Sequence, residues 1–336
     1  MSLKVLFRLG RHFHPHPHNV ISSVSRRAFA ALSPTEINDR LRAFETDDTK
    51  HVAEDDVVKS VKEDDNDDGG EEVVSVVSVR SPVKSYDKNV LPSNTPCEDS
   101  HAEANFDEGM MFGVFDGHGG HYCGQVVSKR LFSYIHAALL PPDRLQRHLA
   151  AQEGESTDDP AYNDSLVSST DAVPFVSVLQ SLYRDSYLKY LRDLTTRSFE
   201  STSAKFEHAF ISLDEDMSAE ALDAPEMSDT DLHTRHVALS GAVAAVAHIE
   251  GNRLTLAGCG DCVGVIGSLS ENNTWVATKL SREHNSDNRE EVARIKGEHP
   301  GERDIIRGDR LHGILAPLRA FGDFRFKWPA DVIRDR

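Results

Sequence analysis

The chain has 336 residues, of which 39% are hydrophobic, enough for the core of one large domain. Its formal net charge of −18 argues against nucleic-acid binding, because phosphate backbones would be repelled. The sequence contains no run of about 18 apolar residues that would span a membrane, and its four cysteines are too few for a disulfide framework, which suits a reducing compartment.

Residues 1–35 have the composition of a mitochondrial transit peptide. No acid occurs before Glu36, and four arginines alternate with apolar residues and serines: Arg8, Arg11, Arg26 and Arg27. A positive amphipathic segment is attracted to import receptors and to the inner-membrane potential, which predicts a location in the mitochondrial matrix. The alternative is a disordered basic tail.

Residues 36–72 are expected to form an acidic, disordered linker. Acids are dense from Glu45 to Glu72, and such clusters repel one another and rarely bury apolar surface. A Val-rich strand at Val73–Val79 then opens the domain, which we place at 73–336.

A short apolar run at Met111–Phe115 predicts a buried strand that ends at Asp116. The glycines that follow allow a tight turn and leave room for an ion to approach. The Asp116 carboxylate and the Gly117 carbonyl offer a hard cation two oxygen ligands from adjacent residues. His118 adds a side-chain type suited to proton transfer near neutral pH. The alternative is an ordinary strand-to-helix turn with a capping aspartate.

Further elements follow from periodicity and turn residues. An apolar stripe from Cys123 to Ile135 predicts a helix lying on a sheet. The other expected elements are a surface loop at 152–172, helices at about 176–194 and 204–213, and a β-hairpin of 242–249 and 253–256. Alternating strands and paired helices indicate a layered α/β or α+β fold, between which propensity alone does not decide.

Cys259 and Cys262 form a Cys-x-x-Cys pair, a pattern found in redox sites and in halves of zinc sites. No second pair exists, and the motif spans the Gly260-Asp261 loop instead of a helix start. We therefore disfavour redox or zinc chemistry for this pair, and we expect Cys97 and Cys123 to be packing residues.

Five stretches of the chain together resemble one enzyme family. They are Leu-Pro-Ser-Asn-Thr-Pro-Cys-Glu-Asp at 91–99, Val-Phe-Asp-Gly-His-Gly-Gly at 114–120, Ser-Gly-Ala-Val-Ala at 240–244, Leu-Ala-Gly-Cys-Gly-Asp-Cys at 256–262, and a segment from Leu-Ser-Arg-Glu-His-Asn at 280–285 to Arg-Ala-Phe-Gly-Asp-Phe at 319–324. In this order they resemble the metal-dependent PP2C-type protein serine/threonine phosphatases, most closely the mitochondrial pyruvate dehydrogenase phosphatase branch. The resemblance implies an α+β fold: an α-β-β-α sandwich with two central antiparallel sheets flanked by helices, incomplete at the C-terminus.

The resemblance also implies a two-metal site that uses Mg²⁺ or Mn²⁺. Asp116 matches the carboxylate that bridges both ions, and Gly117 matches the glycine whose carbonyl binds one of them. Glu98 and Asp99 match an acidic pair that holds metal-bound waters, and Asp261 matches the ligand of a weaker third metal. The alternative for Glu98 and Asp99 is a solvated acidic turn.

Catalysis in the family would involve His118, Asp116 and Glu98. Two cations share the phosphate charge and lower the pKa of a bridging water, and the resulting hydroxide attacks phosphorus. His118 matches the general acid that protonates the departing seryl oxygen. Asn94 stands where most relatives carry a phosphate-clamping arginine, so phosphate binding would depend more on the metals. Alternatively, Asn94 only shapes the turn at Pro92–Pro96.

The sequence departs from the family pattern near its last residue, Arg336. The family supplies two further metal-binding aspartates from the C-terminal third of the domain, and neither motif occurs here. Asp323 belongs to a different motif and Asp331 follows no apolar strand, so we expect neither to substitute. The chain is thus interpreted as a C-terminally truncated phosphatase, expected to turn over more slowly than an extended form.

Three functions remain open from the sequence. The first is a phosphatase that hydrolyses phosphoserine on the pyruvate dehydrogenase E1α subunit, with the E2 core and a regulatory subunit as further candidate partners. The second is a catalytically inactive relative that acts as a binding or regulatory protein. The third is a PP2C phosphatase that acts on other mitochondrial phosphoproteins.

Overall fold

The computed structural model describes residues 3–8, 83–92, 94–154, 167–168, 176 and 178–335. The predicted linker at 36–72 and the predicted strand at Val73–Val79 lie outside these residues, as does most of the predicted transit peptide. Of that first segment, Leu3–Arg8 is described and forms strand β1.

The described elements alternate between antiparallel strands and helices. In chain order they are β1 (Leu3–Arg8), β2 (Ser100–Phe106), β3 (Gly109–His118), α2 (Tyr122–Leu139), α3 (Pro142–Glu153), β4 (Val167–Ser168), α5 (Gln180–Leu194), α6 (Thr202–Asp223), α7 (Asp229–Leu239), β5 (Gly241–Glu250), β6 (Arg253–Cys259), β7 (Val263–Leu269), β8 (Trp275–Lys279), α8 (Arg289–Glu298), β9 (Ile306–Arg307), β10 (Arg310–Leu311), β11 (Phe321–Gly322), the 3₁₀ helix η2 (Phe324–Phe326) and α9 (Ala330–Asp335).

A six-stranded antiparallel sheet forms the centre of the fold. Its order is β11-β5-β3-β2-β4, and β6 also pairs with β5. Strand β5 is buried from Gly241 through His248, and its side chains are mostly alanine and valine. Small side chains on both faces of a central strand allow other layers to pack closely against it.

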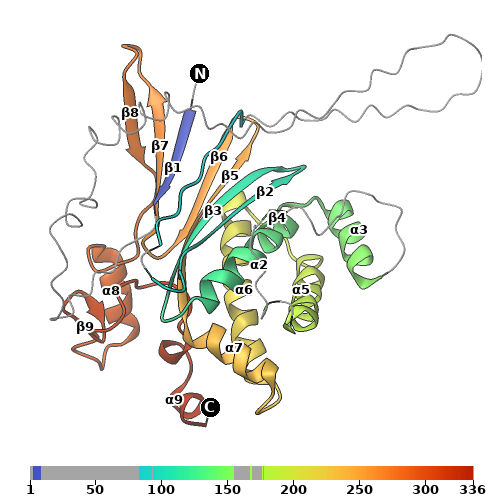
Figure 1. Ribbon diagram of the computed structural model, residues 1–336, viewed down its shortest axis with the longest axis vertical. Coiled ribbons are helices and arrows are strands. Elements are labelled where there is room, and N and C mark those ends of the chain that lie inside the picture. Colours follow the sequence, from blue (N-terminus) through green and yellow to red (C-terminus); the bar gives the residue numbers. More distant parts are fainter. Residues whose placement is uncertain are drawn as a thin grey trace, which may run out of the picture.

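Helices α2, α5, α6 and α7 cover one face of this sheet, and a three-stranded sheet, β1-β7-β8, lies on the other side (Figure 1). Helix α2 packs directly on β3, as its apolar stripe predicts: Val126, Val127, Leu131 and Ile135 are all 0% exposed. The long helix α6 packs beside α2 and also contacts β11 and β6 of the sheet. The main hydrophobic core therefore lies between the sheet and these helices.

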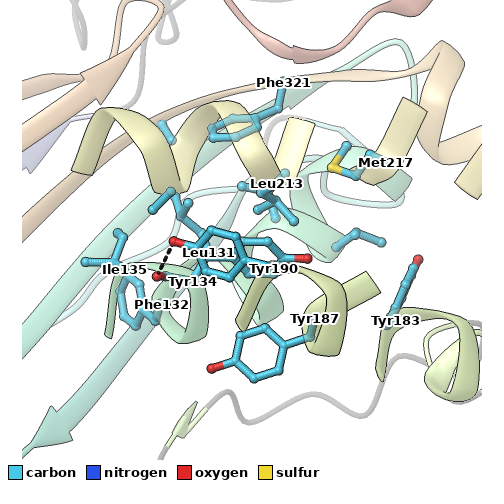
Figure 2. Packing of buried hydrophobic residues seen from close by; sticks show 14 of the residues in the cluster. Leu131, Phe132, Tyr134, Ile135, Tyr183, Tyr187, Tyr190, Leu213, Met217 and Phe321 are labelled. Carbon is cyan, nitrogen blue, oxygen red and sulfur yellow. Dashed lines mark hydrogen bonds between the residues drawn. The ribbon is translucent and has the colours of Figure 1, made fainter. Parts of the chain in front are cut away.

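Tyrosines from α2 and α5 fill the outer part of this core (Figure 2). The ring centroid of Tyr134 lies 4.5 Å from that of Tyr190 and 5.4 Å from that of Tyr187. The Tyr190 hydroxyl donates to the main-chain oxygen of Tyr134 at 3.0 Å, and the Tyr134 hydroxyl donates to Asp216 at 2.6 Å. The hydroxyls of Tyr134 and Tyr190 are thus satisfied while their rings stay buried.

A buried ion pair joins α2 to α6 inside the helical layer. The Arg130 guanidinium donates to both carboxylate oxygens of Glu220, at 2.8 and 2.7 Å. It also lies 4.0 Å from the ring centroid of Tyr183, and the Ser186 hydroxyl donates to Glu220 at 2.6 Å. A charge buried to this extent is tolerated only because its partner and hydrogen bonds are in place.

Several sequence predictions are confirmed by these elements. The structure has the predicted α+β class, with antiparallel sheets and flanking helices. The stripe from Cys123 to Ile135 lies in α2, and the predicted hairpin is β5 and β6. Helix α5 begins at Gln180, close to the expected start at about 176. Within the part of the chain that the structure describes, every helix is too short or too polar to traverse a bilayer.

Three predicted boundaries were wrong. Strand β3 does not end at Phe115 but continues through His118, because Asp116, Gly117 and His118 still pair with β5. Helix α6 spans 22 residues instead of the expected 204–213, since acidic residues, including the buried Glu220, interrupt its apolar pattern after Leu213. In the predicted loop at 152–172, α3 extends to Glu153 and β4 occupies Val167–Ser168, while the rest lies outside the described residues.

The buried ion pair provides a test of the helical layer. We expect Arg130→Ala to lower the free energy of unfolding by about 3–5 kcal/mol, because it leaves the Glu220 carboxylate buried and unpaired. Urea denaturation followed by circular dichroism measures this change. Arg147→Ala is the matched control: Arg147 pairs with Asp143 on the surface of α3 at 3.4 Å, and its loss should cost less than about 1 kcal/mol. Equal effects of the two substitutions would contradict this description of the core.

Candidate metal centre

The predicted site lies on the last three residues of β3. Asp116, Gly117 and His118 pair with Val243, Ala242 and Gly241 of β5. Because side chains alternate along a strand, Asp116 and His118 share one face of the sheet and Phe115, which is 0% exposed, points into the core on the other. The continued pairing fixes the position of both functional side chains.

Three other carboxylates act electrostatically on Asp116. Partial burial and the negative charges of Asp99, Asp261 and Glu98 raise the pKa of Asp116 to about 8. Burial, and then the charge of Glu98, also raise the pKa of Asp99. The four acids that the sequence singled out, from three separate segments of the chain, are thus near enough for their charges to interact. Such a cluster of like charges is stabilised by protonation or by a bound cation.

The Glu98 carboxylate is held in place by two donors. The Gly120 amide donates to its Oε1 at 2.7 Å, and the Asn94 side-chain amide donates to its Oε2. The main-chain oxygen of Glu98 packs on Gly117 so closely that a Cβ at residue 117 would stand 2.3 Å from it. Only glycine therefore fits at residue 117, which explains why the strand carries glycine beside its aspartate.

Asp261 lies in the turn between β6 and β7, buried at 8% exposure. The preceding Gly260 has a φ of +88°, and a Cβ there would lie 2.1 Å from Val243. Burial raises the pKa of Asp261, although a hydrogen bond from its own backbone and the nearby His118 partly offset this. The turn thus brings a carboxylate against the end of β3.

The Cys-x-x-Cys pair flanks this turn but shows no sign of redox or metal chemistry. Cys259 and Cys262 are both free cysteines, and Cys262 is buried. Burial raises the pKa of Cys259 to about 12, so its thiol stays protonated and unreactive at neutral pH.

The donor set fits a hard divalent cation such as Mg²⁺ or Mn²⁺, because every candidate ligand is an oxygen. Among the described residues, however, no three acidic, histidine or cysteine side chains stand close enough together to enclose an ion. A cation held here would therefore keep several water ligands, as Mg²⁺ commonly does in proteins.

His118 has a partner that the sequence analysis missed. Its Nε2 lies 2.6 Å from Oδ2 of Asp323, a residue 205 positions away in the chain. We had considered Asp323 only as a replacement metal ligand and set it aside. No local signal marks the contact, because it depends on how β11 pairs with β5.

Gly241 makes this contact possible. A Cβ at residue 241 would lie 2.2 Å from His118 Nε2 and 2.3 Å from Asp323 Oδ2. The first residue of β5 must therefore be glycine for the imidazole and the carboxylate to meet.

Comparisons with known proteins show what the chain is similar to. The sequence profile described as Protein phosphatase 2C matches residues 142–333. The "[Pyruvate dehydrogenase [acetyl-transferring]]-phosphatase 1, mitochondrial" of Bos taurus is 38% identical over 266 residues, which cover 75% of this chain and 48% of that protein. The corresponding phosphatase 2 of Homo sapiens is 34% identical over 308 residues, covering 90% of this chain and 54% of that protein. The chain thus spans about half the length of the curated relatives it matches.

Gly241 gives a test of the site's packing. We expect Gly241→Ala to lower the free energy of unfolding by about 1–3 kcal/mol, because the added methyl group forces His118 and Asp323 apart. The control is Gly297→Ala in α8, where a Cβ would meet nothing within 4 Å; there a gain of about 0.5–1 kcal/mol is expected. Chemical denaturation of both variants measures the difference. A stability of Gly241→Ala equal to that of the unsubstituted protein would contradict the observed contact.

Proposed function

Because the chain belongs to the Protein phosphatase 2C family, we propose that it is a metal-dependent phosphatase that hydrolyses phosphoserine on the pyruvate dehydrogenase E1α subunit. The observation that carries the proposal is the convergence of Glu98, Asp99 and Asp261 on Asp116, with His118 on the same face of the sheet. The names of the relatives support the substrate, and they describe proteins about twice as long as this chain.

In this proposal the four carboxylates and one carbonyl hold the metal ions. Asp116 and the Gly117 carbonyl would bind directly, Glu98 and Asp99 would act through water, and Asp261 would hold a further ion. Bound Mg²⁺ or Mn²⁺ would supply positive charge to phosphate oxygens and make coordinated water acidic. The hydrogen bonds from Asn94 and Gly120 keep the Glu98 carboxylate aimed at this site.

His118 serves as the proton donor to the departing seryl oxygen. It is only partly exposed, and one ring nitrogen, Nε2, is occupied by Asp323. The other, Nδ1, remains for proton exchange with the substrate. General-acid help is needed because a serine alkoxide is a poor leaving group, and such help is worth about 10²–10⁴-fold in rate.

Asn94 has a double role in the proposal. One amide hydrogen bonds to Glu98, and the side chain is exposed. Its second amide hydrogen is available for a phosphate oxygen, with no charge to assist it. Phosphate recognition would therefore depend mainly on the metal ions, unlike a site that uses an arginine clamp.

The proposed location is the mitochondrial matrix. The matched relatives are named as mitochondrial, and the arginine-rich, acid-free segment at 1–35 has the composition of an import signal. Phosphorylated E1α is the proposed partner, with the E2 core and a regulatory subunit as further candidates.

The proposal is tested with the full chain, a phosphoserine peptide and Mn²⁺. We expect Mn²⁺-dependent release of phosphate that is abolished by a chelator and reduced at least about 100-fold by Asp116→Asn, the effect of losing a major electrostatic contact. Asp331→Asn is the matched control, because Asp331 is an exposed aspartate of α9 outside the site. Its activity should be unchanged.

Two results would contradict the proposal. If Asp116→Asn retained full Mn²⁺-dependent activity, the carboxylate cluster would not be the catalytic centre. If the unsubstituted chain bound the phosphopeptide but released no phosphate, the inactive binding protein would be the better description. A preference for other mitochondrial phosphopeptides over the E1α sequence would overturn the substrate alone.

A further inference from the structure

The contact between His118 and Asp323 joins two segments that the chain keeps 205 residues apart. His118 ends β3, and Asp323 follows β11, the two-residue strand that pairs with the start of β5. The Nε2–Oδ2 distance of 2.6 Å is short, as expected for a hydrogen bond to an ionised carboxylate. The Asp323 side chain is 3% exposed, so little water competes for the bond.

The turn that carries Asp323 is anchored at several points. The main-chain amide of Asp323 donates to the main-chain oxygen of Ser240 at 2.9 Å, and Ser240 directly precedes Gly241. The Gly322 amide donates to Oδ1 of Asp214 in α6 at 2.9 Å, and Lys327 donates to the same carboxylate. A turn fixed from both the sheet and a helix holds its carboxylate in one position relative to β3.

Asp323 adopts an unusual backbone conformation to make this contact. Its φ is 52° and its ψ is 33°, which lie in the left-handed region that residues other than glycine seldom occupy. Residues held in this region are concentrated at functional sites, where surrounding structure compensates for the strain. The backbone conformation of Asp323 therefore points to a functional role. Its contact with His118 indicates which residue that role concerns.

The second carboxylate oxygen argues against a purely structural role. Oδ1 of Asp323 is buried and has no hydrogen-bond partner among the residues that the structure describes. Leaving a buried acceptor unpaired costs about 1–3 kcal/mol. An apolar side chain would place no unpaired acceptor there, so the stability of the turn alone does not call for a carboxylate.

We propose that Asp323 is a positioning residue that holds the His118 ring in one orientation by accepting a hydrogen bond from Nε2–H, so that Nδ1 carries the additional proton that the leaving group receives. The carboxylate accepts only, so the neutral ring keeps its one proton on Nε2, and Nδ1 takes up a second proton from solvent, which the imidazolium then donates to the leaving oxygen. Gly241 keeps the space in which the two side chains meet. The inference rests on the proposed function, in which His118 donates a proton to the leaving group.

Asp323→Asn is the decisive substitution. Asparagine has nearly the same shape and tolerates the left-handed conformation, but its amide can donate to Nε2 and so favour the opposite tautomer. In a Ser-His-Asp triad the equivalent change leaves the geometry intact and lowers kcat by about 10⁴-fold through this effect. A structural role and a positioning role therefore predict different results for one variant.

The first readout is the tautomer itself, measured on the metal-free protein. Histidine-selective ¹⁵N labelling and two-bond ¹H–¹⁵N correlation distinguish the two ring nitrogens, and the His118 signals are assigned as those missing from His118→Gln. We expect the proton on Nε2 in the unsubstituted protein and on Nδ1 in Asp323→Asn. An unchanged His118 tautomer in Asp323→Asn would overturn the proposal, whatever the activity.

The second readout compares two substrates of different leaving-group strength in the presence of Mn²⁺. p-Nitrophenolate departs without protonation, whereas a seryl oxygen needs the general acid. We expect Asp323→Asn to lower kcat on a phosphoserine peptide at least about 100-fold and on p-nitrophenyl phosphate less than about five-fold. Equal losses on both substrates, or no loss on the peptide, would overturn the proposal.

Asp309→Asn is the matched control. Asp309 is also an aspartate in the left-handed region, with a φ of 61°, but it is exposed. The Asp309→Asn substitution should leave the His118 tautomer and both kcat values unchanged. If the unsubstituted chain hydrolysed neither substrate, the proposed function would fail, and the tautomer measurement would still decide whether Asp323 positions His118.

Discussion

Asp116 is half-buried among the negative charges of Asp99, Asp261 and Glu98, and this repulsion is the constraint on which the site depends. Partly desolvated carboxylates placed this close together destabilise one another unless a proton or a cation intervenes. The fold nevertheless holds all four in place through β-sheet pairing, the anchored Glu98 and the buried turn at Asp261. A bound metal ion would supply the positive charge that offsets the repulsion between these carboxylates.

Glycines at the points of contact allow the charged segments to meet. Gly117 admits the Glu98 main chain, Gly260 lies against Val243, and Gly241 leaves the space for His118 and Asp323. At each of these positions a methyl group would lie within 2.3 Å of a neighbouring atom. The small residues of β5 continue this pattern through the sheet, so the strand that supports the site is also the strand that permits close packing.

Much of the site could be predicted from short-range sequence features. The apolar run before Asp116 predicted its strand, the stripe after Cys123 predicted α2, and the five motif stretches identified Glu98, Asp99 and Asp261 as its companions. Their roles as ligands remain predictions, while the influence of their negative charges on Asp116 follows from the structure. The end of β3 was misplaced, because glycine and histidine weaken a strand signal and only pairing with β5 extends it.

Asp323 could not be placed from the sequence, because its role depends on tertiary contacts. Its own neighbours form a two-residue strand and a 3₁₀ turn, too short to show any periodicity. The same limit applies to the Arg130–Glu220 pair, since nothing in the local pattern of α2 or α6 indicates which polar residue is buried. Local sequence patterns therefore do not predict which polar side chains pair when they are far apart in the chain.

The central claim is that the carboxylates around Asp116 are held in mutual repulsion that a divalent cation relieves. The most direct measurement is the thermal unfolding midpoint of the full chain at neutral pH, with and without Mn²⁺, for the unsubstituted protein and Asp116→Asn. The account predicts that Mn²⁺ raises the midpoint of the unsubstituted protein in a concentration-dependent way. It also predicts that Asp116→Asn unfolds at a higher temperature without metal and no longer responds to Mn²⁺. A midpoint insensitive to Mn²⁺ in the unsubstituted protein, together with a lower metal-free midpoint in Asp116→Asn, would contradict it.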